Sequence, residues 1–268
     1  MEITLFGPLK VRVGESTLRA SDIGGAKPRG LLELLLLARG RTVSKEQLAD
    51  ALWGDQQPQN VAGTLEHYVC VLRRRLFTDQ ALARRVLRTE PGAYRFDTSM
   101  VQLDLDRFDQ LMMQAELADA ARRPQLLAEA VGVAHHELLD DSPYASWVQQ
   151  DRDLYRSRVA RAHLALSRHH LAVGNHEGAV RHGEEALRFA PYSEEAFRVI
   201  MVADYAMGMS DLARHTHLRC RQVLGDVLGV DPATETETVS AAIDAGVPAT
   251  ELVRAFLDRG LMSLLAAA

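Results

Sequence analysis

The sequence has few of the features that mark secreted or membrane proteins. Its only two cysteines, Cys70 and Cys220, lie far apart and cannot form a disulfide framework, so a reducing cytoplasm is the expected compartment. The longest leucine-rich run, LLELLLLA at residues 31–38, is much shorter than the roughly 20 residues that cross a bilayer. The opening MEITLFGPLKVRV lacks the charged and apolar regions of a signal peptide. We therefore expect a cytoplasmic protein without a membrane partner.

Catalytic and cofactor motifs are also missing. The sequence contains no GxSxG and no dinucleotide fingerprint, and GGAKPRG at residues 24–30 does not complete a phosphate-binding P-loop. On a helix, His217 and Cys220 would share a face, which makes a zinc site conceivable. Without a CxxC or HExxH frame, two such residues are more often ordinary surface residues. The sequence predicts no enzyme, no cofactor and no metal.

Charge is divided unevenly along a chain whose formal net charge is −5. Residues 1–98 carry 15 Lys and Arg against 11 Asp and Glu, whereas residues 99–268 carry 16 against 25. A basic front half in an acidic protein indicates that the front half alone meets a polyanion.

The order of elements in residues 1–98 predicts an α+β winged helix-turn-helix. Residues 1–20 alternate in hydrophobicity, as in a small antiparallel sheet. An apolar helix is expected at 28–38, and a second begins with the capping box of Ser44 and Gln47 and ends at Gly54. A third helix follows at 61–76, and VLRTEPGAYRFD, residues 86–97, predicts a β-hairpin.

The helix at 61–76 holds the strongest binding signal. Its apolar residues Val61, Leu65, Val69, Leu72 and Leu76 are spaced to form one buried face. As the second helix of the helix-turn-helix it would enter the major groove, with phosphate contacts at the helix before it and on the hairpin. The alternative is a solvated helix end whose cations interact with the helix dipole. The expected DNA contacts are Thr64, His67, Val71, Arg73, Arg74, Arg75, Lys45, Arg88, Thr89 and Arg95.

From residue 103 onward, helical periodicity replaces strand signals. LAVGNHEGA at 171–179 aligns with YAMGMSDLA at 205–213, an offset that indicates tetratricopeptide-like helix pairs rather than a plain bundle. We place a winged-helix domain at 1–98, an all-α tetratricopeptide-like domain at 103–245 and a helical tail at 246–268. The apolar stripe Leu252, Phe256, Leu257 and Leu261 in the tail either caps the last repeat, which we favour, or forms a homodimer contact.

The blocks LADALWG, LRRRL and PGAYRF, in this order, with VQLDLDRFDQL and VLGDVLGVDPATE behind them, resemble the Streptomyces antibiotic regulatory protein family. Arg73 and Arg74 match the arginine pair of that family. The resemblance implies an OmpR-type winged helix followed by a bacterial transcriptional activation domain. It also implies binding to direct repeats upstream of promoters, with recruitment of RNA polymerase through its sigma or alpha subunit. On this basis the loop residues Asp55, Gln56, Gln57 and Asn60 would face the polymerase.

One position departs from the family pattern. Members commonly read Ser-Arg before the Leu-Arg-Arg of the recognition helix, where this chain has Cys70 and Val71. A valine on the outward face can touch a thymine methyl group but cannot contact phosphate or guanine. The target sequence therefore differs from the family's usual repeat, or the affinity for DNA is lower.

The sequence thus predicts a DNA-binding transcriptional activator, with secondary-metabolite genes as candidate targets. Two alternatives stay open. One is a protein-interaction adaptor that works through the repeat domain, and the other is a regulator gated by a small molecule in the repeat groove.

Overall fold

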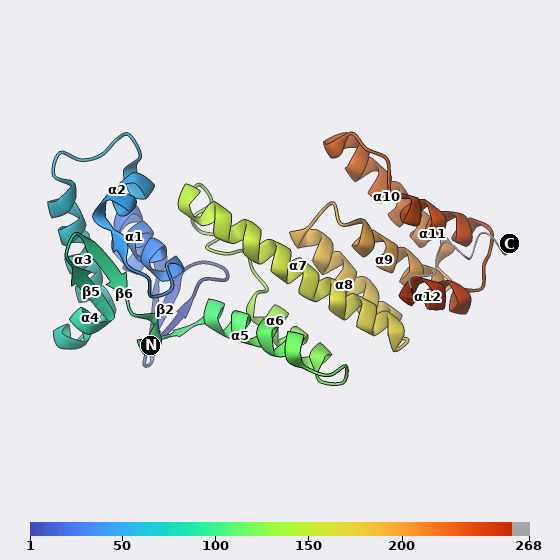
Figure 1. The fold of residues 1–268 in the computed structure, drawn as a ribbon, viewed down its shortest axis with the longest axis horizontal. Helices are drawn as coiled ribbons and strands as arrows, with labels where there is room; N and C mark the ends of the chain where they lie inside the picture. The colour runs from blue at the N-terminus through green and yellow to red at the C-terminus, as the bar shows by residue number, and fades with distance from the viewer. Residues whose placement is uncertain (259–268) are drawn as a thin grey trace. The chain divides into compact units, whose positions relative to one another are not determined.

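The computed structural model describes residues 1–258, which divide into two compact units (Figure 1). The first contains Met1–Gln110 and Gly132–Tyr155, and the second contains Leu111–Val131 and the chain from Arg156 onward. The first unit therefore extends past residue 98 and takes in a segment that the sequence-based division assigns to the helical domain. Within residues 1–258, none of the helices combines the length and apolar character that crossing a bilayer requires.

The first unit begins with a small sheet, and the antiparallel part confirms the predicted one. Ile3 lies opposite Val11, and both side chains are buried. The last strand pairs parallel to the first through Ile3 and Leu103. This pairing was not predicted, because a two-residue strand carries no readable alternation. The strands, in the order β3-β2-β1-β7, are β1 Glu2–Thr4, β2 Lys10–Val13, β3 Ser16–Arg19 and β7 Gln102–Leu103.

Three helices pack next, as predicted, at α1 Ala26–Leu37, α2 Lys45–Trp53 and α3 Val61–Leu76. The capping box at α2 is confirmed: Ser44 Oγ accepts a hydrogen bond from the Gln47 amide at 3.0 Å, and Gln47 Oε1 accepts one from the Ser44 amide at 3.1 Å. Asn60 caps α3 through one bond, in which its side-chain oxygen accepts from the Gly63 amide at 2.9 Å. The apolar face of α3 is buried at Leu65, Val69, Leu72 and Leu76, whereas Val61 is only half-buried.

The predicted hairpin is present as part of a three-stranded sheet in the order β4-β6-β5. Its strands are β4 Val43–Ser44, β5 Leu87–Glu90 and β6 Ala93–Phe96. A short helix, α4 Gln80–Val86, leads into β5 and was not predicted. The Asp79 side chain caps it by accepting from the Ala81 amide at 2.8 Å. The hairpin, α3 and α4 therefore form one continuous corner of the first unit.

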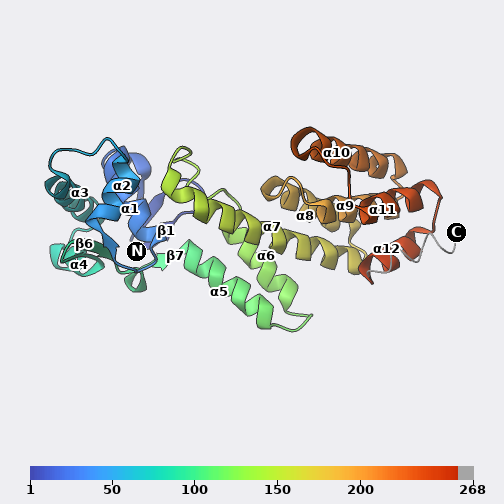
Figure 2. The same ribbon diagram turned by 45° about the horizontal axis from the view of Figure 1, so that its top comes forward.

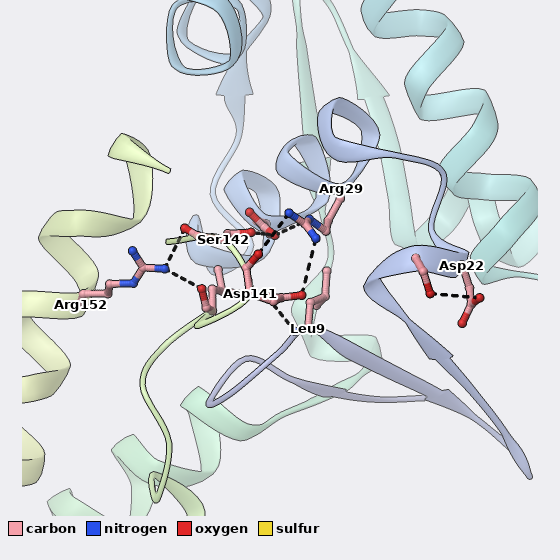
Figure 3. Close-up of polar contacts among 9 residues, drawn as sticks. Leu9, Asp22, Arg29, Asp141, Ser142 and Arg152 are labelled. Carbon is pink, nitrogen blue, oxygen red and sulfur yellow. Dashed lines mark hydrogen bonds and ion pairs between the residues drawn. The ribbon is translucent and has the colours of Figure 1, made fainter. Parts of the chain in front are cut away.

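The segment Gly132–Tyr155 joins the first unit through backbone bonds. The Leu139 amide donates to the Leu5 carbonyl at 2.8 Å, and the Gly7 amide donates to the Glu137 carbonyl at 2.7 Å. Arg152 is buried and donates to main-chain carbonyls of this segment, including that of Ser142 at 2.9 Å (Figure 3). These bonds close the segment into a fixed loop against β1.

Side chains connect the same segment to α1. The Ser142 hydroxyl donates to Glu33 Oε1 at 2.8 Å, and Arg29 approaches both Glu33 and Asp141 at 3.3 and 3.6 Å (Figure 3). A Cβ atom at Gly30 would lie 2.9 Å from the Trp147 ring. The glycine inside α1 therefore makes room for the indole.

The second unit is built from antiparallel helix pairs, in which α9 packs between α8 and α10 (Figures 1 and 2). The predicted repeat, which aligns residues 171–179 with 205–213, is confirmed as helix pairs, with Gly174 and Gly208 at left-handed φ values of 77° and 78° in equivalent turns. Gly183 allows close packing, because a Cβ atom there would lie 2.6 Å from Ile200. The helices, some of which begin in the first unit, are α5 Asp104–Leu117, α6 Arg123–Val133, α7 Gln149–Ala172, α8 His176–Phe189, α9 Glu194–Ala206, α10 Ser210–Leu228, α11 Thr234–Asp244 and α12 Ala249–Leu257.

The apolar stripe predicted in the tail lies partly in α12. Leu252 and Phe256 are buried in a cluster with residues of α9 and α11, and Leu257 packs against it. Leu261 lies outside the described residues. The buried side chains favour the capping interpretation, because they are already covered within the unit.

Candidate nucleic-acid interface

The solvent-facing side of α3 carries His67 and Arg74, both exposed. Arg75 follows and is exposed as well. Within residues 1–258, neither Arg74 nor Arg75 has a hydrogen-bond or ion-pair partner for its guanidinium group. An arginine without a partner keeps all five of its N–H donors for a ligand. These three residues are therefore the most available of the predicted contacts on α3.

Two other predicted contacts on α3 are less available. Thr64 is half-buried, and its hydroxyl donates to the Asn60 carbonyl at 2.8 Å. Val71 is half-buried beside the loop before α1, where a Cβ atom at Gly24 would lie 2.9 Å from Val71 Cγ1. Gly24 also has a φ of 113°, which favours glycine. Val71 thus helps to pack α3 against the entry to α1.

Arg73 points from α3 to the hairpin. Its Nη2 atom donates to the Leu87 carbonyl at 2.6 Å and to Thr89 Oγ1 at 2.9 Å, and its Nε atom donates to the same carbonyl at 3.1 Å. Burial, together with the positive charge of Arg84, lowers the pKa of the Arg73 guanidinium. Two predicted DNA contacts, Arg73 and Thr89, therefore bind each other and fix the hairpin to α3.

Lys45 and the N-terminus of α2 are also partly engaged. Lys45 Nζ lies 2.9 Å from Glu66 Oε1 and 5.5 Å from the centre of the Tyr94 ring. The hydrogen bond to Glu66 raises the pKa of Lys45. The Lys45 amide donates to the Gly92 carbonyl at 2.9 Å, and the Gln47 amide is used by the Ser44 cap. These two amides are therefore not open to phosphate, although the sequence predicts phosphate contacts at this helix.

On the hairpin, Arg88 and Arg95 lie directly opposite each other on β5 and β6. Like charges at such a cross-strand pair are unfavourable unless an anion compensates them. Arg88 donates to the Arg85 carbonyl at 2.9 Å and to Asp97 at 2.7 Å. Arg95 is half-buried, and within residues 1–258 its buried Nε atom has no hydrogen-bond partner. The pair gives the hairpin a positive edge.

The loop between α2 and α3 is exposed at Asp55, Gln56 and Gln57. Gln57 donates to Asp50 at 2.9 Å, and Asn60 is occupied as the α3 cap. Asp55 and Gln56 are the members of the predicted polymerase-facing set whose side chains have no hydrogen-bond partner in the described part of the chain.

The histidine and cysteine considered for zinc lie in the second unit and have other partners. His217 Nε2 lies 3.1 Å from Glu237 Oε1, and its Nδ1 atom lies 3.1 Å from Ser240 Oγ. Cys220 is buried, which raises the pKa of its thiol to about 11. Among residues 1–258, no three His, Cys, Asp or Glu side chains are grouped so as to hold a metal ion.

Comparison with known proteins agrees with this arrangement. Residues 24–96 match the family described as "Transcriptional regulatory protein, C terminal", and residues 103–244 match the "Bacterial transcriptional activator domain". The chain belongs to the Streptomyces antibiotic regulatory protein family. It is thus a DNA-binding transcriptional regulator, the general function of that family.

Relatives cover most of the chain. Regulatory protein AfsR of Streptomyces griseus is 30% identical over 88% of the chain, although the chain spans only 24% of AfsR. MoaR1 of Mycobacterium tuberculosis is 26% identical over 94% of the chain and 82% of MoaR1. The transcriptional regulator RedD of Streptomyces coelicolor is 26% identical over 87% of the chain and 67% of RedD.

A solved structure supports the fold. Mycobacterium tuberculosis EmbR, in complex with a low-affinity phosphopeptide, superposes with a TM-score of 0.78 at 24% identity, covering 98% of this chain and 70% of EmbR. This likeness extends over both units. It supports the prediction of a winged helix-turn-helix followed by a tetratricopeptide-like helical domain.

Sequence reasoning missed Arg84 of α4, which is exposed beside the hairpin. The signal was present in TDQALARRV at residues 78–86, where Asp79 is a good N-cap and two arginines follow at the end of a short helix. The helix has only 7 residues, too few for its periodicity to stand out in the sequence.

Proposed function

We propose that this regulator binds double-stranded DNA with α3 in the major groove and activates transcription by recruiting RNA polymerase. In this proposal His67 and Arg74 reach base edges, Arg75 contacts phosphate, and the β5–β6 hairpin contacts the adjacent backbone or minor groove. Arg73 and Thr89 act by holding the hairpin in register with α3, and Thr64, Val71 and Lys45 support the helix positions.

The observation that carries this proposal is the concentration of arginines on one corner of the first unit, where, within residues 1–258, Arg88 alone has a carboxylate partner, Asp97. Arg74 and Arg75 have no internal partner in the described residues, and Arg88 and Arg95 oppose each other across the hairpin. A folded protein gains nothing from leaving like charges together, unless a polyanion neutralises them. An arginine at the exposed face of a recognition helix is also suited to a bidentate bond with guanine.

The wider role follows the family. We propose binding to direct repeats upstream of promoters in the cytoplasm, with a homodimer on DNA and secondary-metabolite genes as candidate targets. Asp55 and Gln56, exposed on the α2–α3 loop, are the proposed contacts with the sigma or alpha subunit of the polymerase.

The test is a fluorescence anisotropy titration of the full chain against the DNA directly upstream of its own coding sequence. We expect Arg74→Ala to weaken binding by about 1–3 kcal/mol, the usual value of one good base contact. Arg12→Ala is the matched control, because it removes an exposed guanidinium from β2, on the first sheet. Binding that is absent, insensitive to salt or equally weakened by both variants would contradict the proposal.

A further inference from the structure

An open pocket of about 440 Å³ lies between α4 and β5. Its lining residues are Arg73, Arg84, Arg88, Thr89 and Glu90. Three arginines from three successive elements, α3, α4 and β5, thus line one hollow. The sequence motifs did not predict this pocket, because α4, which forms one side of it, was not predicted.

Internal hydrogen bonds fix two of these arginines without using all of their donors. Arg73 is held by the Leu87 carbonyl and Thr89 through Nε and Nη2. Arg88 is held by the Arg85 carbonyl and Asp97, again through Nε and Nη2. A guanidinium has five N–H donors in a planar fork, so in both residues the Nη1 donors remain for a ligand. The pocket is therefore organised before any ligand binds.

Arg84 has no hydrogen-bond or ion-pair partner within residues 1–258, and it lies close enough to Arg73 to lower the pKa of that residue. The one carboxylate at the pocket, Glu90, accepts a hydrogen bond from the Thr42 hydroxyl at 2.8 Å. Glu90 and Asp97, which pairs with Arg88 at 2.7 Å, offset part of the charge of the three arginines, so the pocket keeps a net positive charge. Such an arrangement favours an anion that offers several oxygen atoms.

We propose that this pocket binds a phosphate group of the DNA backbone next to the hairpin, with Arg84 as its main ligand and Arg73 and Arg88 as fixed supporting donors. This inference rests on the proposed function, since α3 and β5, which border the pocket, are elements of the proposed DNA contact. Arginine suits this role because its fork binds two phosphate oxygens at once. A backbone phosphate contact positions the protein without reading sequence.

The experiment measures how Kd depends on salt for the full chain and a labelled mixed-sequence duplex. Each phosphate contact contributes about 0.9 to the slope of log K against log salt, so Arg84→Ala should lower the slope by about 0.9 and weaken binding about eightfold at 0.1 M salt. Arg85→Ala is the matched control, because Arg85 is the neighbouring exposed arginine of α4 and does not line the pocket. It should leave the slope nearly unchanged. Thermal unfolding of both variants checks that they fold alike.

Three results would overturn the proposal. Equal slopes for the parent and Arg84→Ala would show that the pocket does not contact the backbone. An equal decrease of the slope in Arg84→Ala and Arg85→Ala would show that only the net charge of α4 matters, and not the pocket. A thermal shift with inorganic phosphate that Arg84→Ala abolishes, with an unchanged DNA slope, would assign the pocket to a free anion. If the parent chain itself binds no DNA, the proposed function fails together with this inference. The three results above, in contrast, contradict the pocket proposal while the parent still binds DNA.

Discussion

At the scale of single residues, the three consecutive arginines of α3 have different tasks. Successive residues of a helix point about 100° apart, so the side chains cannot share one environment. Arg73 donates to the Leu87 carbonyl and to Thr89 on the hairpin, whereas Arg74 and Arg75 are exposed. The sequence predicts that all three lie at the end of a recognition helix, but it does not show which of them donates hydrogen bonds to the hairpin.

This division predicts opposite effects for two neighbouring substitutions. Arg73→Ala should lower the free energy of unfolding by about 1–3 kcal/mol, because it removes charge-assisted hydrogen bonds and leaves the Leu87 carbonyl without these donors. Arg74→Ala should change stability by less than about 0.5 kcal/mol, as an exposed residue without partners, while weakening DNA binding. Urea unfolding and anisotropy on the same samples measure both. Equal stability of the two variants would contradict the structural role of Arg73.

At the scale of elements, α7 and α8 meet through a pair of histidines. His163 Nδ1 lies 3.0 Å from His182 Nδ1, and the His170 ring stacks on His182 with 5.2 Å between the ring centres. Burial lowers the pKa of both His163 and His182 to about 4. The packing of the two helices therefore favours the neutral form of both histidines.

The histidine pair predicts a pH dependence of stability. In the unfolded chain histidine ionises near pH 6.5, so between pH 6.5 and 4 the unfolded state binds more protons than the folded state. Stability contributed by the pair is present above pH 6.5 and is lost as pH falls toward 4, with a slope of at most about 1.4 kcal/mol per pH unit for each proton. His163→Phe keeps a ring and cannot titrate, so urea unfolding of this variant should show a shallower loss on acidification.

Buried carboxyl groups act in the opposite direction. Burial raises the pKa of Asp104 and Asp204 to about 6. As pH falls from 6 to 4, the folded state therefore binds more protons at these groups than the unfolded state, and their contribution to stability increases. The difference between His163→Phe and the parent, rather than the parent alone, isolates the pair. His215→Gln, at an exposed histidine of α10, is the control. An unchanged slope in His163→Phe would show that the pair is protonated in the folded state.

At the scale of the whole molecule, residues distant in sequence complete the first unit. Phe6, Phe108 and Tyr155 meet edge to face with ring centres 5.5 to 5.8 Å apart. The buried Glu33 of α1 accepts from Ser142, more than one hundred positions along the chain. The winged helix is thus stabilised by a segment that follows it only after α5 and α6.

This connection predicts the effect of replacing Glu33. Glu33→Ala should lower the free energy of unfolding by about 3 kcal/mol, because it leaves the Ser142 hydroxyl without its acceptor and removes one of the two carboxylates beside Arg29. Glu33→Gln keeps an acceptor and should cost much less, since burial already raises the pKa of Glu33 and weakens its charged form. Ser142→Ala in the Glu33→Ala background should add little. Additive losses in that double variant would show that the two side chains do not cooperate.

The elements that could be predicted are those with a local signal. The bounds of α3, the capping box of α2 and the glycine turns of the repeat follow from side-chain spacing and from residue types at helix ends. The strand β7 and the joining of Gly132–Tyr155 to the first unit depend on partners far away in sequence. No local pattern shows that Gly30 makes room for Trp147 or that Arg73 will bind the Leu87 carbonyl. The sequence predicted which residues form the candidate site. Which of its cations are exposed, and which form internal hydrogen bonds, depends on the packing of the folded chain.

The most direct test of the central claim is methylation protection on the bound DNA. Dimethyl sulfate modifies guanine N7 in the major groove and adenine N3 in the minor groove, and the two acceptors lie in different grooves. If α3 lies in the major groove, the full chain should protect guanine N7 positions in its binding site, and Arg74→Ala should remove the protection at one guanine. Protection confined to adenine N3, or a guanine pattern that Arg74→Ala leaves intact, would contradict the account.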